Sequence, residues 1–122
     1  MKISKILLVD DDRLCRRIAE IYLRQAGKFE VIVADSGEQA LEQAEKEQPD
    51  LILLDTRMPG MDGFTTLVKL RDKASTCSIP VIFLTAGDVD REASRTSGVL
   101  GTIIKGNMSG LVDAISSLTK NL

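Results

Sequence analysis

Short apolar segments alternate with segments of helical periodicity along the whole chain, and this alternation restricts the fold more than any other feature. The apolar segments are 5–9, 30–34, 51–54, 81–84 and 99–104. The helical patterns that follow them cover about 14–26, 37–48, 63–70, 89–97 and 111–118. Strands that alternate with helices favour parallel pairing through right-handed crossovers. The sequence therefore predicts an α/β fold, a doubly wound (βα)5 unit around one five-stranded parallel sheet, with 30–34 as an edge strand.

Length and composition exclude several kinds of protein. The 122 residues match one domain, spanning 1–122, and no apolar run approaches the ~18–20 residues of a membrane span. The chain has no histidine, which excludes a Ser-His-Asp triad and a Cys-His dyad. The net charge of −2 and the few aromatic residues do not indicate nucleic-acid binding. Cys15 and Cys77 lie far apart, and unpaired thiols favour a cytoplasmic location.

Polar side chains stand where the predicted strands end. Asp10 and Asp11 follow the first strand, Asp55 the third, Thr85 the fourth and Lys105 the fifth. In an open parallel sheet, the carboxyl ends of the strands border the functional crevice. We therefore expect these five residues to converge on one edge of the sheet.

The chemistry of this group points to a metal and a phosphoryl group. Two carboxylates ~4 Å apart repel by about 1 kcal/mol in water and about 4 kcal/mol at an effective dielectric constant of 20. A hard divalent ion would relieve this repulsion, and Mg²⁺ prefers a few carboxylates, waters and a phosphate. Lys105 adds a fixed cation and Thr85 a hydroxyl donor. Asp55, at the middle strand end, is the expected nucleophile and would become an aspartyl phosphate.

Purely structural roles are expected for some polar residues outside this group. They would also account for some members of the group if each were considered alone. Asp12 precedes a helical pattern and is expected to cap it, and Asp62 is expected to cap the third helix. Thr85 alone could be a turn residue, and Lys105 alone a solvated charge. Only the coincidence of suitable groups at four strand ends favours a site.

Four segments together resemble the receiver domain of bacterial two-component response regulators. They are Leu7-Leu8-Val9-Asp10-Asp11-Asp12, Leu54-Asp55-Thr56-Arg57-Met58-Pro59-Gly60-Met61-Asp62-Gly63, Leu84-Thr85-Ala86 and Lys105. The resemblance implies a flavodoxin-like sheet with strand order 2-1-3-4-5. It also implies that Asp55 accepts phosphate from a phosphohistidine of a sensor histidine kinase or phosphotransfer protein. Such a chain acts on a downstream protein effector and is not a turnover enzyme.

The resemblance also implies roles for individual residues around Asp55. Asp11, Asp55 and the backbone carbonyl of Arg57 would hold Mg²⁺, with Asp10 acting largely through water. Thr85 and Lys105 would bind the phosphoryl oxygens.

A second set of residues would govern the duration and the readout of phosphorylation. Arg57 and Gly87 are expected to tune the lifetime of the aspartyl phosphate, and Thr85 and Thr102 are the expected switch positions. Thr102 departs from the family, which tends to have an aromatic residue three positions before the lysine. Gly106 also departs from it, because the family usually has a proline, often cis, after the lysine. A weakly apolar helix at 89–97 is expected to shift on phosphorylation.

Other classes of protein remain open at this point. A haloacid-dehalogenase-type phosphatase would use Asp10, Asp12, Thr85 and Lys105, but it leaves the segment around Asp55 without a role. A flavodoxin-like cofactor carrier would need a phosphate loop where the three aspartates stand. A receiver-shaped binding module that is never phosphorylated is the third alternative. A homodimer through the last two helices is a further option.

Overall fold

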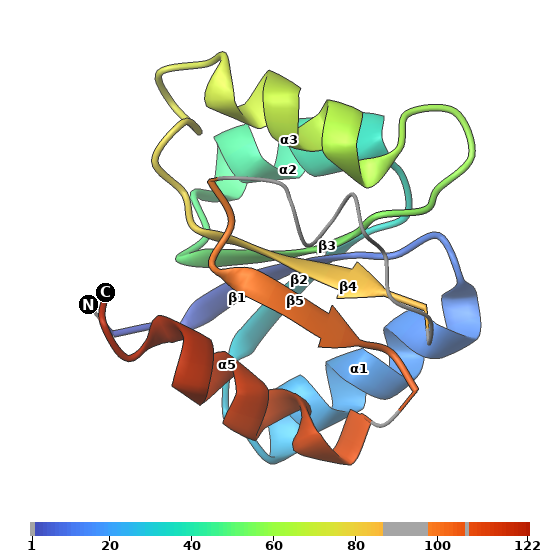
Figure 1. The fold of residues 1–122 in the computed structure, drawn as a ribbon, viewed down its shortest axis with the longest axis vertical. Helices are drawn as coiled ribbons and strands as arrows, with labels where there is room; N and C mark the ends of the chain where they lie inside the picture. Colours follow the sequence, from blue (N-terminus) through green and yellow to red (C-terminus); the bar gives the residue numbers. More distant parts are fainter. Residues whose placement is uncertain (1, 87–97, 107) are drawn as a thin grey trace.

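The computed structural model describes residues 2–86, 98–106 and 108–122, and its described elements alternate as the sequence predicts (Figure 1). The strands are β1 (Lys5–Val9), β2 (Glu30–Ala34), β3 (Leu51–Asp55), β4 (Val81–Thr85) and β5 (Gly101–Ile104). The helices are α1 (Arg13–Gln25), α2 (Gly37–Glu47), α3 (Gly63–Arg71), the short 3-10 helix η1 (Met108–Gly110) and α5 (Leu111–Thr119).

The five strands form one parallel sheet in the order β2-β1-β3-β4-β5. This confirms the predicted fold class and strand order, and it places β2 at an edge as expected. Val9 pairs with Leu54, and Thr85 pairs with Ile104. Because all the strands run the same way, the residues that follow them gather along one edge of the sheet.

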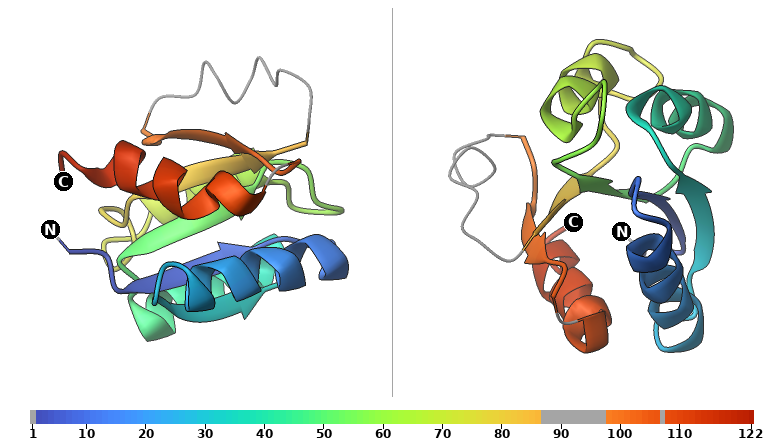
Figure 2. Two further views of the ribbon diagram at one scale, coloured as in Figure 1. Left: turned by 90° about the horizontal axis from the view of Figure 1, so that it is seen from below. Right: turned by 90° about the vertical axis from the view of Figure 1, so that its right-hand side faces the viewer.

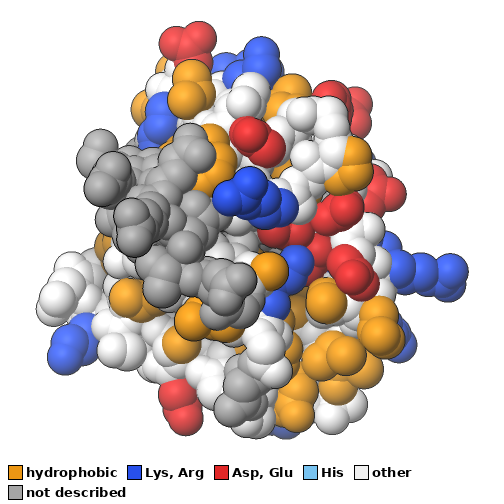
Figure 3. Space-filling model, turned by 45° about the vertical axis from the view of Figure 1, so that its right-hand side comes forward, with side chains coloured by type: hydrophobic (Ala, Val, Ile, Leu, Met, Phe, Trp, Pro, Cys, Tyr) orange, Lys and Arg blue, Asp and Glu red, His pale blue; other side chains and the backbone are white. Residues whose placement is uncertain are grey.

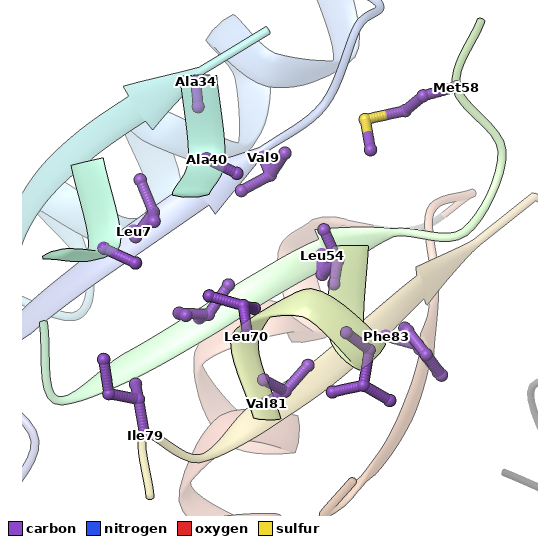
Figure 4. Close-up of a cluster of buried hydrophobic side chains, with 13 residues drawn as sticks. Leu7, Val9, Ala34, Ala40, Leu54, Met58, Leu70, Ile79, Val81 and Phe83 are labelled. Carbon is purple, nitrogen blue, oxygen red and sulfur yellow. The ribbon is translucent and has the colours of Figure 1, made fainter. Parts of the chain in front are cut away.

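Helices cover both faces of the sheet. Helices α2 and α3 lie on one face, and α1 and α5 lie on the other (Figure 2). Every residue of β3 and β4 is therefore buried, as the continuous apolar runs 51–54 and 81–84 predict, and the polar ends Asp55 and Thr85 are buried with them. One core contains Leu7, Leu54 and Phe83 beneath α2 and α3 (Figure 4), and the second contains Leu8, Leu53 and Ile82 on the face of α1 and α5.

Side-chain caps fix where α1 and α3 begin. The carboxylate of Asp12 accepts hydrogen bonds from the backbone N–H groups of Leu14 and Cys15, and that of Asp62 accepts one from Thr65. Both predicted caps are thus confirmed, and each satisfies donors that a helix start leaves unpaired. None of the described helices combines the length and apolar character needed to cross a membrane.

The last strand differs from its prediction. It begins at Gly101 instead of at residue 99, because the chain is still leaving a turn in which Gly98 has a left-handed backbone, with φ of 86°. The predicted helix at 89–97 and the predicted tuning residue Gly87 lie outside the described residues. The described residues contain no cis peptide bond, so the Lys105–Gly106 bond is trans.

Candidate functional site

Three carboxylates meet at the carboxyl ends of β1 and β3. Asp10 and Asp11 follow β1, and Asp55 is the last residue of β3, the strand beside it. One carboxylate oxygen from each residue lies within 4.8 Å of the other two. Asp10 and Asp55 are 1% and 2% exposed, whereas Asp11 is exposed to solvent. Figure 3 shows acidic side chains gathered on this side of the molecule.

Lys105, which follows the edge strand β5, bridges two of these acids. Its Nζ lies 3.0 Å from Asp55 Oδ2 and 3.1 Å from Asp10 Oδ2. The backbone N–H of Lys105 donates to the carbonyl of Thr85 at 2.8 Å, which fixes the start of its side chain beside β4. Charge-assisted contacts of this length between buried groups are strong, so Lys105 holds Asp10 and Asp55 together.

Backbone donors orient the two buried carboxylates. The N–H of Asp12 donates to Asp10 Oδ1 at 2.9 Å, and the N–H of Arg57 donates to Asp55 Oδ1 at 3.1 Å. In Asp55, one oxygen therefore contacts the backbone and the other contacts Lys105. This arrangement fixes the plane of the carboxylate before any ligand is present.

Burial is the main influence on the acidity of Asp55. It raises the pKa of this carboxyl from 3.8 to about 6, against the hydrogen bond from Arg57 and the contact with Lys105, while the charge of Asp10 raises it further. Repulsion by Asp10 is the smaller of these two causes that raise the pKa of Asp55. Burial also lowers the pKa of Lys105, yet its contacts with Asp55 and Asp10 outweigh this and raise the pKa overall. At neutral pH the site thus contains an ammonium group and a largely ionised Asp55.

The donor set fits a hard divalent cation. Three carboxylates and one ammonium group give the site an excess of two negative charges. Oxygen ligands of this kind suit Mg²⁺, which retains several waters and uses one or two carboxylates. The exposure of Asp11 leaves one side of the group open to water and to a ligand.

The other predicted site residues occupy different surroundings. Thr85 is buried at the end of β4, next in the sheet to β3, which ends in Asp55. Arg57 has an exposed side chain and lines a cavity of about 430 Å³ beside Met58, Pro59 and Asp62. Thr102 is exposed on β5, opposite Phe83 in the register. The structure brings Thr85 to the same strand edge as the acids, and it places Thr102 on the outer strand.

Sequence reasoning gave no role in the site to two residues that lie near it. Arg16, on α1, donates from Nη1 to the backbone carbonyl of Asp10 at 2.8 Å. Gly63 begins α3 so close to β3 that a Cβ there would lie 2.3 Å from the carbonyl oxygen of Asp55. The sequence offered only weak signals for them: an arginine in the first turn of a helix, and a glycine at a helix start.

Comparison with known proteins identifies the family. The response regulator receiver domain model matches residues 6–116, and the chain belongs to this family. It is 44% identical over 96 residues to the response regulator PleD of Caulobacter vibrioides, which covers 79% of this chain and 20% of PleD. It is 39% identical to the nitrate/nitrite response regulator protein NarL of Escherichia coli, over 84% of this chain and 48% of NarL. The chain thus spans between a fifth and about half of the length of such relatives.

Solved structures agree with the family. The chemotaxis protein CheY4 of Vibrio cholerae superposes with a TM-score of 0.85 at 28% identity, covering 96% of this chain and 99% of CheY4. A response regulator from Chloroflexus aurantiacus gives the same TM-score at 32% identity, over 96% of this chain and 98% of its own. The phosphatase alternative gains no support, because the carboxylate of Asp12, which it requires, is occupied in capping α1.

Proposed function

We propose that residues 1–122 form one receiver domain that accepts a phosphoryl group on Asp55 in an Mg²⁺-dependent reaction. The observation that carries this proposal is the grouping of Asp10, Asp11 and Asp55 within 4.8 Å, with the Lys105 ammonium 3.0 Å from Asp55. The chain's membership of the receiver family supports it as well.

The transfer that we propose is a displacement at phosphorus. A carboxylate oxygen of Asp55 attacks the phosphorus of a phosphohistidine, an O–P bond forms, and the P–N bond breaks with its electron pair returning to the imidazole. Lys105 and Thr85 would contact the phosphoryl oxygens, because both stand at the same strand edge as Asp55. When bound by Asp10, Asp11, Asp55 and the carbonyl of Arg57, Mg²⁺ would neutralise negative charge on the transferring group.

The chain would then lose the phosphoryl group to water, so it acts as a timed switch and not as a turnover enzyme. Arg57 lies two residues past Asp55 with an exposed side chain. We propose that Arg57 and Gly87 set the lifetime of the aspartyl phosphate. We assign Thr85 and Thr102 to the readout, which proceeds here without the aromatic switch residue usual in the family.

An apolar surface beside the site supports protein partners. Leu14, Ile18, Ile21 and Tyr22 are exposed on α1, and Leu14 is 69% exposed. A groove of about 200 Å³ continues this surface to Lys105. Figure 3 shows hydrophobic side chains adjoining the acidic group. Exposed apolar patches of this kind mark protein contacts, and we propose a sensor histidine kinase or phosphotransfer protein as donor and a protein as effector.

The proposed location is the cytoplasm, where response regulators would meet such donors. Both cysteines, Cys15 and Cys77, are free thiols. A reducing compartment keeps thiols in this state.

A phosphorylation-independent binding module is the second candidate. The trans bond before Gly106 and the exposed, non-aromatic Thr102 favour it, because both depart from the usual receiver readout. The intact acids and Lys105 favour the first candidate.

Intact-mass spectrometry separates these candidates. The protein is incubated with acetyl phosphate and Mg²⁺, and we expect a mass gain of one phosphoryl group that Asp55→Asn abolishes. Asp50→Asn is the matched control, since Asp50 binds the backbone of Ser4 and Lys5 away from the site. If the wild-type chain gains no mass, phosphorylation of Asp55 is refuted and the phosphorylation-independent binding module is the candidate that remains.

A further inference from the structure

Arg16 binds the main chain of the turn that carries two of the three acids. Its Nη1 donates to the carbonyl oxygen of Asp10 at 2.8 Å, and its own N–H donates to the carbonyl of Asp12 at 2.9 Å. The side chain is half-buried in the first turns of α1. Arg16 thus spans the turn from helix to strand end.

The carbonyl that Arg16 holds belongs to the peptide linking Asp10 to Asp11. Two other main-chain groups of this turn have partners of their own: the N–H of Asp10 donates to the carbonyl of Ala34, and the N–H of Asp12 donates to the Asp10 carboxylate. Fixing the carbonyl of a planar peptide also fixes the direction of the next N–H and Cα. The Arg16 contact therefore restricts the direction in which the side chain of Asp11, the exposed acid of the group, projects from the main chain.

We propose that Arg16 is a positioning residue of the metal site, which holds the Asp10–Asp11 peptide so that both carboxylates face a divalent cation. This inference rests on the proposed function, since it concerns the same site. Arg16 acts through the main chain and does not contact the reacting atoms. Groups that orient metal ligands in this way typically change metal affinity 10–100-fold when removed.

A role of Arg16 through its charge and a role through positioning predict opposite changes in Mg²⁺ affinity when Arg16 is replaced. Removing a cation next to an acidic group should strengthen Mg²⁺ binding if Coulomb attraction alone matters. Releasing the turn should weaken binding, because the acids then have to be ordered as the metal binds. The sign of the change in affinity therefore distinguishes the two roles.

The test measures Mg²⁺ affinity of the unphosphorylated protein by isothermal titration calorimetry. Arg16→Met should weaken binding about 10-fold or more. Arg17→Met is the matched control: its side chain is 68% exposed and pairs with Glu20, so its loss should leave the affinity nearly unchanged. Arg16→Gln is the second variant should Arg16→Met fail to fold, and it should change affinity in the same direction.

Two further measurements complete the test. In the metal-free protein, Arg16→Met should speed amide exchange at Asp11 and Asp12. In Arg16→Met treated with acetyl phosphate, the Mg²⁺ concentration that gives half-maximal phosphorylation should rise relative to wild type. The phosphorylation rate at saturating Mg²⁺ should fall by a smaller factor. Folded Arg16 variants that bind Mg²⁺ as tightly as wild type, or more tightly, would overturn the inference. A wild-type chain that binds no Mg²⁺ would overturn the proposed function, and the inference with it.

Discussion

Replacing Asp55 with asparagine should make the metal-free protein more stable at neutral pH. Burial raises the pKa of this carboxyl from 3.8 to about 6, so the folded state favours its protonated form more than the unfolded state does. Stability from this group is therefore fully present below about pH 3.8 and is lost as the pH rises through about 6. Asparagine keeps the shape of the side chain and has no proton to lose.

The size of the effect follows from the pKa shift. One pKa unit corresponds to about 1.4 kcal/mol, so the shift at Asp55 sets an upper value of roughly 3 kcal/mol. The neutral amide still accepts from the N–H of Arg57 but binds Lys105 less strongly than a carboxylate does. We therefore expect Asp55→Asn to raise the free energy of unfolding by about 1–3 kcal/mol above pH 7.

Urea denaturation in EDTA at several pH values provides the assay. The difference between Asp55→Asn and wild type should be near zero at pH 4, grow until about pH 6 and then level off. Added Mg²⁺ should reduce this difference in stability, because wild type binds the metal more tightly than Asp55→Asn and is therefore stabilised more. Asp50→Asn should instead lower the free energy of unfolding at neutral pH, since the hydrogen bonds from Lys5 and Ser4 lower the pKa of Asp50 and the ionised form stabilises the folded state.

The pH dependence is the discriminating part of this experiment. If Asp55→Asn is less stable than wild type at pH 7.5 in EDTA, the claim that the buried, ionised Asp55 carboxylate destabilises the folded protein is refuted. A gain that is the same at pH 4 and pH 7.5 would show that packing, and not ionisation, is responsible.

Three further predictions concern the loop between β3 and α3 and the first residue of α3. Gly63→Ala should destabilise by about 1–3 kcal/mol and slow phosphorylation, because its Cβ would lie 2.3 Å from the Asp55 carbonyl; a gain in urea stability, as helix propensity alone predicts, would contradict this. Asp62→Ala should lower stability by about 1 kcal/mol through loss of the α3 cap, and an unchanged urea midpoint would count against it. Arg57→Ala should change the rate at which Asp55 loses its phosphoryl group, and an unaltered rate excludes the tuning role.

Most of the fold could be predicted because burial on both faces leaves a clear sequence pattern. Ile6–Val9 and Leu51–Leu54 are continuous apolar runs, which predict strands. Because the carboxyl ends of parallel strands share one edge of the sheet, the aspartates at these ends could be predicted to lie together. The start of β5 could not be placed, because Val99 and Leu100 are as apolar as the strand itself. They follow the left-handed turn at Gly98 directly and lie before the first residue of β5, Gly101.

The site was predictable in its residues but not in its environment. Sequence positions indicated which acids would meet, but not that Asp10 would be buried while Asp11 stays exposed. Burial of one carboxylate depends on side chains from several elements, so its effect on the pKa of Asp55 requires coordinates. The contact of Arg16 with a carbonyl was also hidden, because any residue type offers that acceptor.

Locating the phosphoryl group tests the central claim most directly. The protein is phosphorylated with acetyl phosphate and Mg²⁺, reduced with borohydride, which converts an aspartyl phosphate to homoserine, and analysed by peptide mass spectrometry. We predict homoserine at position 55 alone, and none when EDTA replaces Mg²⁺. Modification at another aspartate, or at Asp55 without a divalent metal, would contradict the claim that Asp10, Asp11 and Asp55 form a metal site that prepares Asp55 for attack.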